Sequence, residues 1–280
     1  MNDSILVLAN FADAAEATAR YAAALGTPLL LRLAMLHLEV YPVMPEPELV
    51  AAAAEQTQRY ETETMAGLQA LGRRLPGHPE VLEAAGVMSG CVAAAVRQQH
   101  PLLLALGLSH ARHLLDRLLL DQVLPVLRAT HRPLLLVPKA ALHIGPPRRV
   151  LMAVDGEPFT PNAASRALAP LLAAWAAAYT VGYVHGQPEQ FDQASGRLAL
   201  ADVRASGLLP AAAPLALYET ADACPATGVL QAIADTQADL LVLIARPRSF
   251  LGELFHRSVT AAVLRHCSVP VLLLPAEPLD

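Results

Sequence analysis

The chain has 280 residues and a mass of 29.6 kDa, near the size at which a single hydrophobic core stops growing, so two domains are expected. Hydrophobic residues make up 54% of the chain and charged residues 16%, which excludes a disordered protein. The formal net charge is −5, and no basic stripe is visible, which argues against a nucleic-acid partner because phosphate binding requires clustered basic side chains.

No segment predicts a membrane span or a signal peptide. The first residues lack a basic start, and the longest strongly apolar stretch, 167–179, is interrupted by Pro170 and is shorter than the roughly 18–20 residues that a span requires. The cysteines Cys91, Cys224 and Cys267 form no CxxC pair, which disfavours a zinc cage or a disulfide framework. We therefore expect a cytoplasmic protein with no membrane partner.

Short apolar runs alternate with longer helical stretches along the whole chain. In the first half, strands are expected at 5–9, 29–38, 81–85, 102–107 and 133–137, with helices at 13–25, 47–75, 91–99 and 116–131. In the second half, strands are expected at 149–154, 179–185, 214–219, 239–245 and 270–274, with helices at 160–177, 188–206, 226–237 and 256–267. This alternation predicts parallel sheets, because parallel strands need crossover connections.

The two halves repeat one another. The segment PLLLVP at 133–138 returns as PVLLLP at 270–275, and VLR at 126–128 returns at 263–265. The same offset of 137 residues separates 133 from 270 and 126 from 263, as expected for a duplicated unit. We therefore predict an α/β fold with two tandem domains, 1–140 and 147–280, each a five-stranded parallel sheet flanked by helices, with a linker at 138–147 that carries proline and glycine.

The chain resembles the universal stress protein family once in each half. The resemblance is carried by DLLVLI at 239–244, SVTAAVLRH at 258–266, PVLLL at 270–274, and the opening VLMAVDG at 150–156. It implies a Rossmann-like fold of the adenine nucleotide alpha hydrolase type. It also implies that the Asp155 carboxylate, at the end of the first strand of the second half, belongs to a ligand site.

Nucleotide-binding members of that family carry a glycine pattern after the fourth strand: Gly, two residues, Gly, nine residues, then Gly followed by Ser or Thr. Glycines there let backbone N–H groups approach the phosphates at a helix N-terminus. In the second half the corresponding residues are Ala245, Arg248 and Arg257, with Ser258 retained and the loop one residue shorter. In the first half they are Gly107, His110 and Leu120, followed by Asp121, and the strand-end aspartate is Asn10. Both patterns are therefore degenerate.

The second half is the better candidate for a ligand site. The residues that the resemblance assigns to cofactor binding are Asp155, Gly156, Val184, Arg248, Ser258, Val259 and Thr260. Two other interpretations stay open, because Asp155 and Gly156 could form an ordinary turn and Ser258 could simply cap a helix. The loop with Arg246, Arg248, His256 and Arg257 could bind phosphate through arginine or be a solvated loop.

Two further groups of residues are candidate sites. His110, Arg112 and His113 beside Asp116 suggest a metal hypothesis, but no third ligand is assigned. Cys91 and Cys224 lie near expected helix starts, where a thiolate is stabilised, although a small buried residue is the default. We expect no metal site and no catalytic residues, because no GxSxG, HExxH or Walker-type motif is present.

The expected function is stress response by binding or regulation, without enzymatic activity and without a bound cofactor. The alternative is an ATP-binding universal stress protein with weak hydrolysis that uses Asp155, Ser258, Thr260 and the arginine-bearing loop described above. The resemblance places the last strand of each half at a sheet edge, and an apolar edge is a template for pairing. We therefore predict that strands 134–137 and 271–274 pair within the chain, and leave open a further homodimer and an unknown protein partner.

Overall fold

The computed structural model describes residues 3–9, 12–39, 50–108, 119–139, 141, 145–186, 193–247 and 258–278. The first half contains β1 (Ser4–Leu8), α1 (Ala12–Gly26), η1 (Thr27–Leu29), β2 (Arg32–Glu39), α2 (Val50–Arg74), β3 (Glu80–Ala85), α3 (Met88–Gln99), β4 (Leu103–Leu108), η3 (Leu119–Val123), α5 (Leu124–Thr130) and β5 (Leu134–Pro138). The second half contains β6 (Arg149–Val154), α6 (Ala163–Arg166), α7 (Ala169–Ala174), β7 (Ala178–His185), α8 (Gln193–Ala205), β8 (Leu215–Ala221), α9 (Pro225–Thr236), β9 (Leu240–Ala245), α10 (Val259–His266) and β10 (Val271–Pro275).

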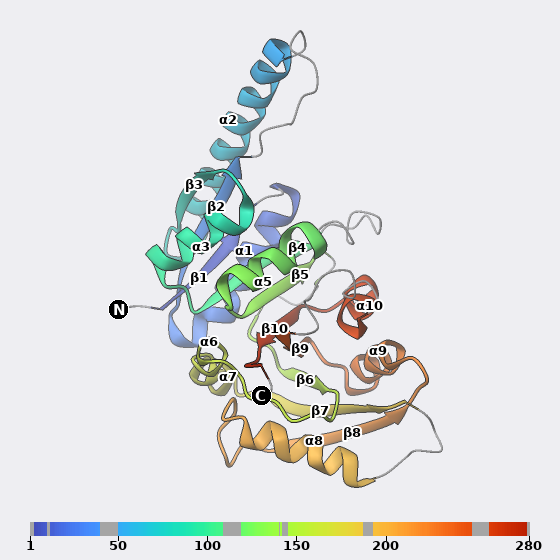
Figure 1. The fold of residues 1–280 in the computed structure, drawn as a ribbon. Helices are drawn as coiled ribbons and strands as arrows, with labels where there is room; N and C mark the ends of the chain where they lie inside the picture. Colours follow the sequence, from blue (N-terminus) through green and yellow to red (C-terminus); the bar gives the residue numbers. More distant parts are fainter. Residues whose placement is uncertain are drawn as a thin grey trace.

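All ten strands form one sheet in the order β3-β2-β1-β4-β5-β10-β9-β6-β7-β8 (Figure 1). Within each half the neighbouring strands are parallel. The predicted α/β class with parallel five-stranded halves is therefore confirmed. The two halves do not form two separate sheets, because β5 and β10 pair antiparallel at the centre.

The central pairing joins the two strands that read alike in the sequence. Leu136 lies opposite Val271, Leu135 opposite Leu272 and Leu134 opposite Leu273. Every residue of β5 and β10 is buried. Continuous apolar runs are the pattern of strands that are covered on both faces, and here each strand also has a neighbour on both sides.

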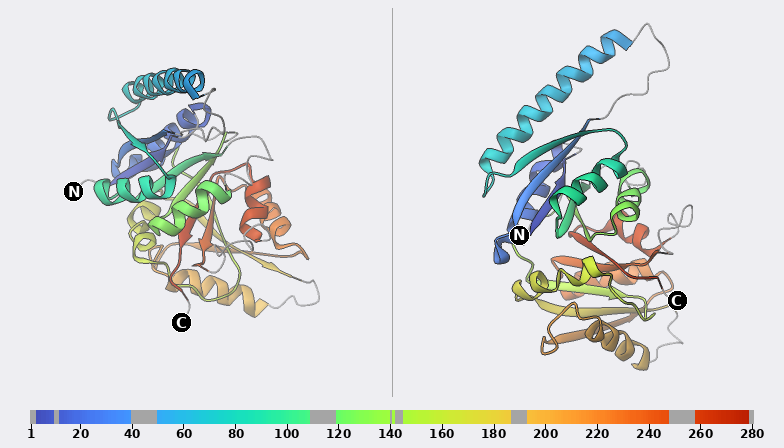
Figure 2. Two further views of the ribbon diagram at one scale, coloured as in Figure 1. Left: turned by 45° about the horizontal axis from the view of Figure 1, so that its top comes forward. Right: turned by 60° about the vertical axis from the view of Figure 1, so that its left-hand side comes forward.

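Helices cover both faces of the sheet, and each face has one apolar core that runs through both halves (Figure 2). The core on one face includes Val96 of α3, Leu127 of α5, Val229 of α9 and Leu264 of α10. The core on the other face takes residues from α1, α2, α7 and α8. Both large cores therefore cross the junction between the halves, and a small third cluster of Ala9, Ala15 and Leu68 lies within the first half.

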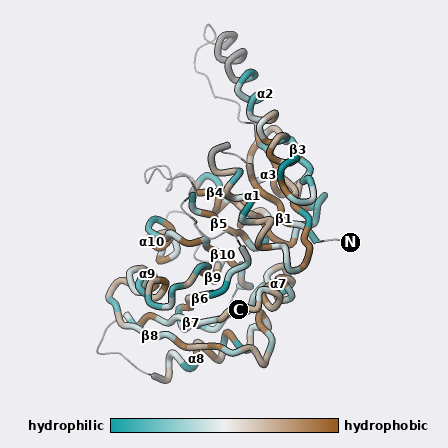
Figure 3. Tube along the Cα trace, turned by 180° about the vertical axis from the view of Figure 1, so that it is seen from behind, coloured by the Kyte–Doolittle hydropathy of each residue, from teal (hydrophilic) through white to brown (hydrophobic). Residues whose placement is uncertain are grey.

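The long helix α2 extends beyond the sheet, and its described residues there are mostly hydrophilic (Figure 3). The buried His37 of β2 contacts it, because Nε2 lies 2.6 Å from the Glu61 carboxylate of α2. The other ring nitrogen lies 3.3 Å from the Ala9 carbonyl oxygen. This pair attaches α2 to β2, the strand next to the edge strand β3.

One predicted helix is wrong in extent, because 160–177 is divided into α6 and α7. The Asn162 side chain accepts a hydrogen bond from Ser165 N and so caps α6. Pro170 then occupies the first turn of α7, where its missing N–H costs nothing. Other predicted boundaries that fall in the described ranges agree to within a few residues, and none of the described helices is both long and apolar enough to cross a membrane.

Candidate functional site

The candidate site lies at the carboxyl ends of β6 and β9, which are neighbours in the sheet. Asp155 directly follows β6, and Arg246 directly follows β9. Since the carboxyl ends of parallel strands meet at the same edge, two residues that are 91 positions apart lie side by side. Open α/β sheets place ligands at this end of the strands.

Arg246 donates four hydrogen bonds at this edge. Its Nε lies 3.0 Å from Asp155 Oδ2, and its Nη2 lies 2.7 Å from Asp155 Oδ1. Nη2 also donates to the Glu157 carbonyl oxygen at 2.6 Å, and Nη1 donates to the Pro158 carbonyl oxygen at 2.9 Å. The Arg246 side chain is only 6% exposed, whereas the Asp155 side chain is 56% exposed. The guanidinium is thus buried beneath the carboxylate that it binds.

Residues 155–158, which we call the Asp155 turn, have their own internal support. Asp155 Oδ1 accepts a hydrogen bond from Glu157 N at 3.1 Å, the geometry of an Asx turn. Gly156 has φ +76°, a conformation that favours glycine, and a Cβ there would lie 2.7 Å from Tyr183 Cε2. The structure therefore shows that Asp155 and Gly156 form a turn, which was one of the two interpretations left open.

Ser258, Val259 and Thr260 lie at the start of α10. Ser258 Oγ accepts a hydrogen bond from Ala261 N at 3.1 Å, so Ser258 is the N-cap of the helix. Val259 and Thr260 occupy the first turn, and the Val259 side chain is exposed. Ser258 thus has the capping role that was considered as the alternative to ligand binding.

The remaining predicted site residues are placed less closely together. Val184 of β7 packs toward α9, because a Cβ on Gly228 would lie 2.5 Å from Val184 Cγ1. Arg248, His256 and Arg257 lie outside the described residues. The contacts at this strand end therefore bring Asp155 and Gly156 together with Arg246 and Tyr183, two residues that the predicted site set omits.

Sequence reasoning named Arg246 only as a member of an arginine loop and missed its pairing with Asp155. The signal was present, because a charged residue that directly follows each of two neighbouring parallel strands must lie at one edge. Finding it required the strand order, in which β6 and β9 are adjacent. Arg246 itself is not a solvated loop residue, since its side chain is buried and paired with Asp155.

A second buried pair lies close to the Asp155 turn. His185 Nε2 of β7 lies 3.2 Å from Glu219 Oε1 of β8. The rings of Tyr183 and His185 meet edge to face with their centroids 4.7 Å apart. Tyr183 therefore connects this pair to Gly156 in the turn that follows the neighbouring strand β6.

The register of the sheet corrects the alignment of the two halves. Leu108 is paired with Pro138 in the first half as Ala245 is paired with Pro275 in the second, so Leu108 and not Gly107 corresponds to Ala245. A Cβ at Gly107 would lie 2.6 Å from Thr18 Oγ1 and from Ala14 Cβ of α1. This glycine therefore permits close packing of α1 on β4.

The other first-half candidates are mostly not described. Asn10, His110, Arg112, His113 and Asp116 lie outside the described residues, and Asp121 is exposed in η3. In the ranges that the structure does describe, no group of three or more His, Cys, Asp or Glu side chains could hold a metal ion.

The cysteines differ in environment. Cys224 is the exposed N-cap of α9, and a hydrogen bond from the Thr227 side chain lowers the pKa of its thiol. Burial raises the pKa of the Cys267 thiol to about 11. Cys91 is half-buried in α3 and packs against the apolar core.

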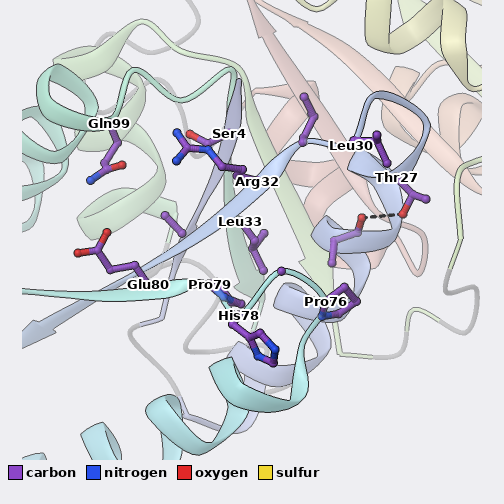
Figure 4. A pocket seen from close by; sticks show the side chains of 14 residues that line it. Ser4, Thr27, Leu30, Arg32, Leu33, Pro76, His78, Pro79, Glu80 and Gln99 are labelled. Atoms are coloured by element: carbon purple, nitrogen blue, oxygen red, sulfur yellow. Dashed lines mark hydrogen bonds between the residues drawn. The ribbon is translucent and has the colours of Figure 1, made fainter. Parts of the chain in front are cut away.

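A cavity of about 430 Å³ lies at the opposite, amino end of β1, β2 and β3 (Figure 4). Its wall combines polar residues such as Arg32 and Gln99 with apolar ones such as Leu33 and Pro76. The Ser4 hydroxyl in this wall is buried without a hydrogen-bond partner. None of the residues that were predicted to bind a cofactor lines it.

Comparison with known proteins identifies a family for the second half of the chain. Residues 147–275 match the profile of the Universal stress protein family. The crystal structure of a universal stress protein from Archaeoglobus fulgidus is 15% identical, with a TM-score of 0.61 over 98% of this chain and 96% of that one. A structure of a Pseudomonas aeruginosa protein given the same family name is 16% identical, with a TM-score of 0.58 over 98% of this chain and 94% of that one.

At these identities the structural likeness establishes the fold of the whole chain, whereas the profile match establishes the family of its second half. No curated protein sequence matches the chain significantly. Residues 147–275 therefore belong to the universal stress protein family, and the first half of the chain repeats the fold of that domain.

Proposed function

We propose that this universal stress protein acts in stress response by binding a partner or ligand other than a nucleoside triphosphate, and that it does not hydrolyse ATP. The proposal depends on one observation: both carboxylate oxygens of Asp155 accept hydrogen bonds from Arg246. The residue that the family resemblance assigns to ligand binding is thus already bonded within the chain.

The neighbouring groups support the same conclusion. A phosphate site at a strand end needs backbone N–H groups that approach the anion closely. Ala245 stands where the family pattern has its first glycine and is buried at the end of β9. Four hydrogen bonds already engage the Arg246 guanidinium, so this arginine does not compensate for the missing glycine by binding phosphate.

The second candidate is an ATP-binding protein with weak hydrolysis. It is favoured by the Gly156 turn at the end of β6 and by Ser258 at the N-terminus of α10. Both are residues that the family resemblance assigns to nucleotide binding. In that case Asp155 exchanges Arg246 for the nucleotide.

Titration calorimetry with ATP and Mg²⁺ separates the two functions. The unmodified protein is expected to show no binding at micromolar ATP and no release of phosphate. Asp222→Ala is a matched control, because Asp222 also accepts a hydrogen bond from a backbone N–H two residues on, that of Cys224. Micromolar binding that disappears in Asp155→Ala but persists in Asp222→Ala contradicts the proposal and supports the ATP-binding alternative.

The proposal also includes the cellular location of the protein and its binding partners. We place the protein in the cytoplasm, with an unknown protein partner and with a homodimer as a further assembly. Cell fractionation tests the location, and light scattering after gel filtration tests the assembly. A strain without the gene is expected to survive stress less well, and restoration by Asp155→Ala as well as by the original gene supports a role independent of nucleotide.

A further inference from the structure

We propose that the Asp155 turn is a guanidinium-binding site whose present occupant is Arg246 of the same chain. This inference deepens the proposed function, since both treat this strand end as closed to nucleotides. It adds the chemical class that the site accepts, which is a planar cation with several N–H donors.

The chemistry of the turn selects a cation. The four groups that face the guanidinium are the two Asp155 carboxylate oxygens and the carbonyl oxygens of Glu157 and Pro158. All four are hydrogen-bond acceptors, and two of them share a negative charge. A phosphate group, which is negatively charged at neutral pH, is repelled by the Asp155 carboxylate at this position.

The geometry favours a guanidinium, which has several N–H donors in one plane, over an ammonium. Nε and Nη2 bind the two oxygens of one carboxylate at 3.0 and 2.7 Å, which is the bidentate arrangement that a planar guanidinium makes and an ammonium does not. Nη1 and Nη2 then reach two successive carbonyl oxygens at 2.9 and 2.6 Å. The Glu157 carboxylate lies farther away, 4.0 Å from Nη1.

The site keeps its shape through contacts that do not involve Arg246. The Glu157 N–H holds Asp155 Oδ1, and Gly156 lies against Tyr183. Just downstream, the Thr160 carbonyl oxygen accepts a hydrogen bond from Glu277 N, and Pro161 is bridged to Ala276. Removal of the arginine side chain is therefore expected to leave a recess lined by acceptors.

Chemical rescue tests the inference. Arg246→Ala is expected to lower the melting temperature, and millimolar methylguanidinium is expected to recover part of that loss. Methylammonium at the same concentration is the charge-matched control and is expected to recover much less. The double variant Arg246→Ala with Asp155→Asn is expected to lose the response, because the bidentate carboxylate is gone.

Arg166→Ala is the matched arginine control. Arg166 also binds a carbonyl oxygen, that of Pro161, and a carboxylate, that of Glu277, but its side chain is 44% exposed. No rescue is expected there. An equal effect of methylguanidinium on the original protein, on Arg166→Ala and on Arg246→Ala overturns the inference, as does equal rescue by methylammonium.

A measurement on the unsubstituted protein covers the case in which Arg246→Ala does not fold. Nuclear magnetic resonance of arginine side chains is expected to show slow solvent exchange of the Arg246 Nε–H and separate Nη signals, while Arg166 exchanges fast. Fast exchange at Arg246 overturns the inference.

The two proposals fail in different experiments. ATP binding to the unsubstituted protein contradicts the proposed function. The inference is then still tested by the methylguanidinium rescue of Arg246→Ala. Stabilisation of Arg246→Ala by ATP but not by methylguanidinium contradicts the inference alone.

Discussion

Truncation of Leu136 tests whether the two halves fold as one unit. Leu136 is fully buried in β5, lies opposite Val271 of β10, and belongs to the core that both halves share. Leu→Ala at a buried site costs the transfer free energy of the lost atoms plus the cavity that remains, about 3–4 kcal/mol at a site that cannot collapse. Here the strands on both sides prevent collapse, because β5 is paired with β4 and with β10.

The expected loss is large enough to measure by two independent probes. At about 2–4 °C per kcal/mol for a protein of this size, Leu136→Ala lowers the melting temperature by about 10 °C. Trp175 is the single tryptophan, and its Nε1 donates to the Leu25 carbonyl oxygen of the other half at 3.1 Å. Its fluorescence therefore reports on the contact between the halves, while far-ultraviolet circular dichroism reports on all helices.

The urea transitions seen by the two probes are expected to coincide, both before and after the substitution. Leu198→Ala on α8 is the control, because that side chain is 63% exposed and its truncation is expected to change stability by less than about 0.5 kcal/mol. Two separated transitions, or equal losses for Leu136→Ala and Leu198→Ala, refute the argument that the halves share one cooperative core.

Two more predictions concern local contacts. Asn162 caps α6 and donates through Nδ2 to the His131 carbonyl oxygen of the first half at 2.8 Å, so Asn162→Ala is expected to lower the free energy of unfolding in urea by about 1–2 kcal/mol. Asn162→Asp keeps the cap and loses only the bond to His131, so it is expected to lose less. Equal losses for the two variants contradict the assignment of separate contributions to the cap and to the His131 bond. At pH 8, iodoacetamide is expected to modify Cys224 much faster than Cys267. The Thr227 hydrogen bond lowers the pKa of the first thiol, whereas burial raises that of the second to about 11, and only the thiolate reacts; mass spectrometry that finds similar rates contradicts the assignment.

The order of elements and the repeat could be predicted because they are local properties of the chain. A strand covered on both faces needs an uninterrupted apolar run, and β4 and β9 carry one. The constant offset between the two Pro-led strands identified the duplication. The same reasoning missed the break between α6 and α7, since an apolar periodicity that runs through Pro170 does not reveal where the backbone hydrogen bonds stop.

The candidate site was predictable only in part. The sequence placed the candidate site at the end of the first strand of the second half. The role of Gly107 was misread, because alignment of a single glycine ignores the pairing register, and the register places Leu108 opposite Pro138. Close packing against Thr18 explains that glycine without a ligand.

The sequence by itself determined the fold class and the duplication, because each depends on the spacing of residue types along the chain. Tertiary structure alone decided that the two large apolar cores run through both halves and that Arg246 binds Asp155. The physical reason is distance along the chain. A hydrogen bond between side chains 91 residues apart exists only once β6 and β9 are neighbours, and no local pattern encodes which strands become neighbours.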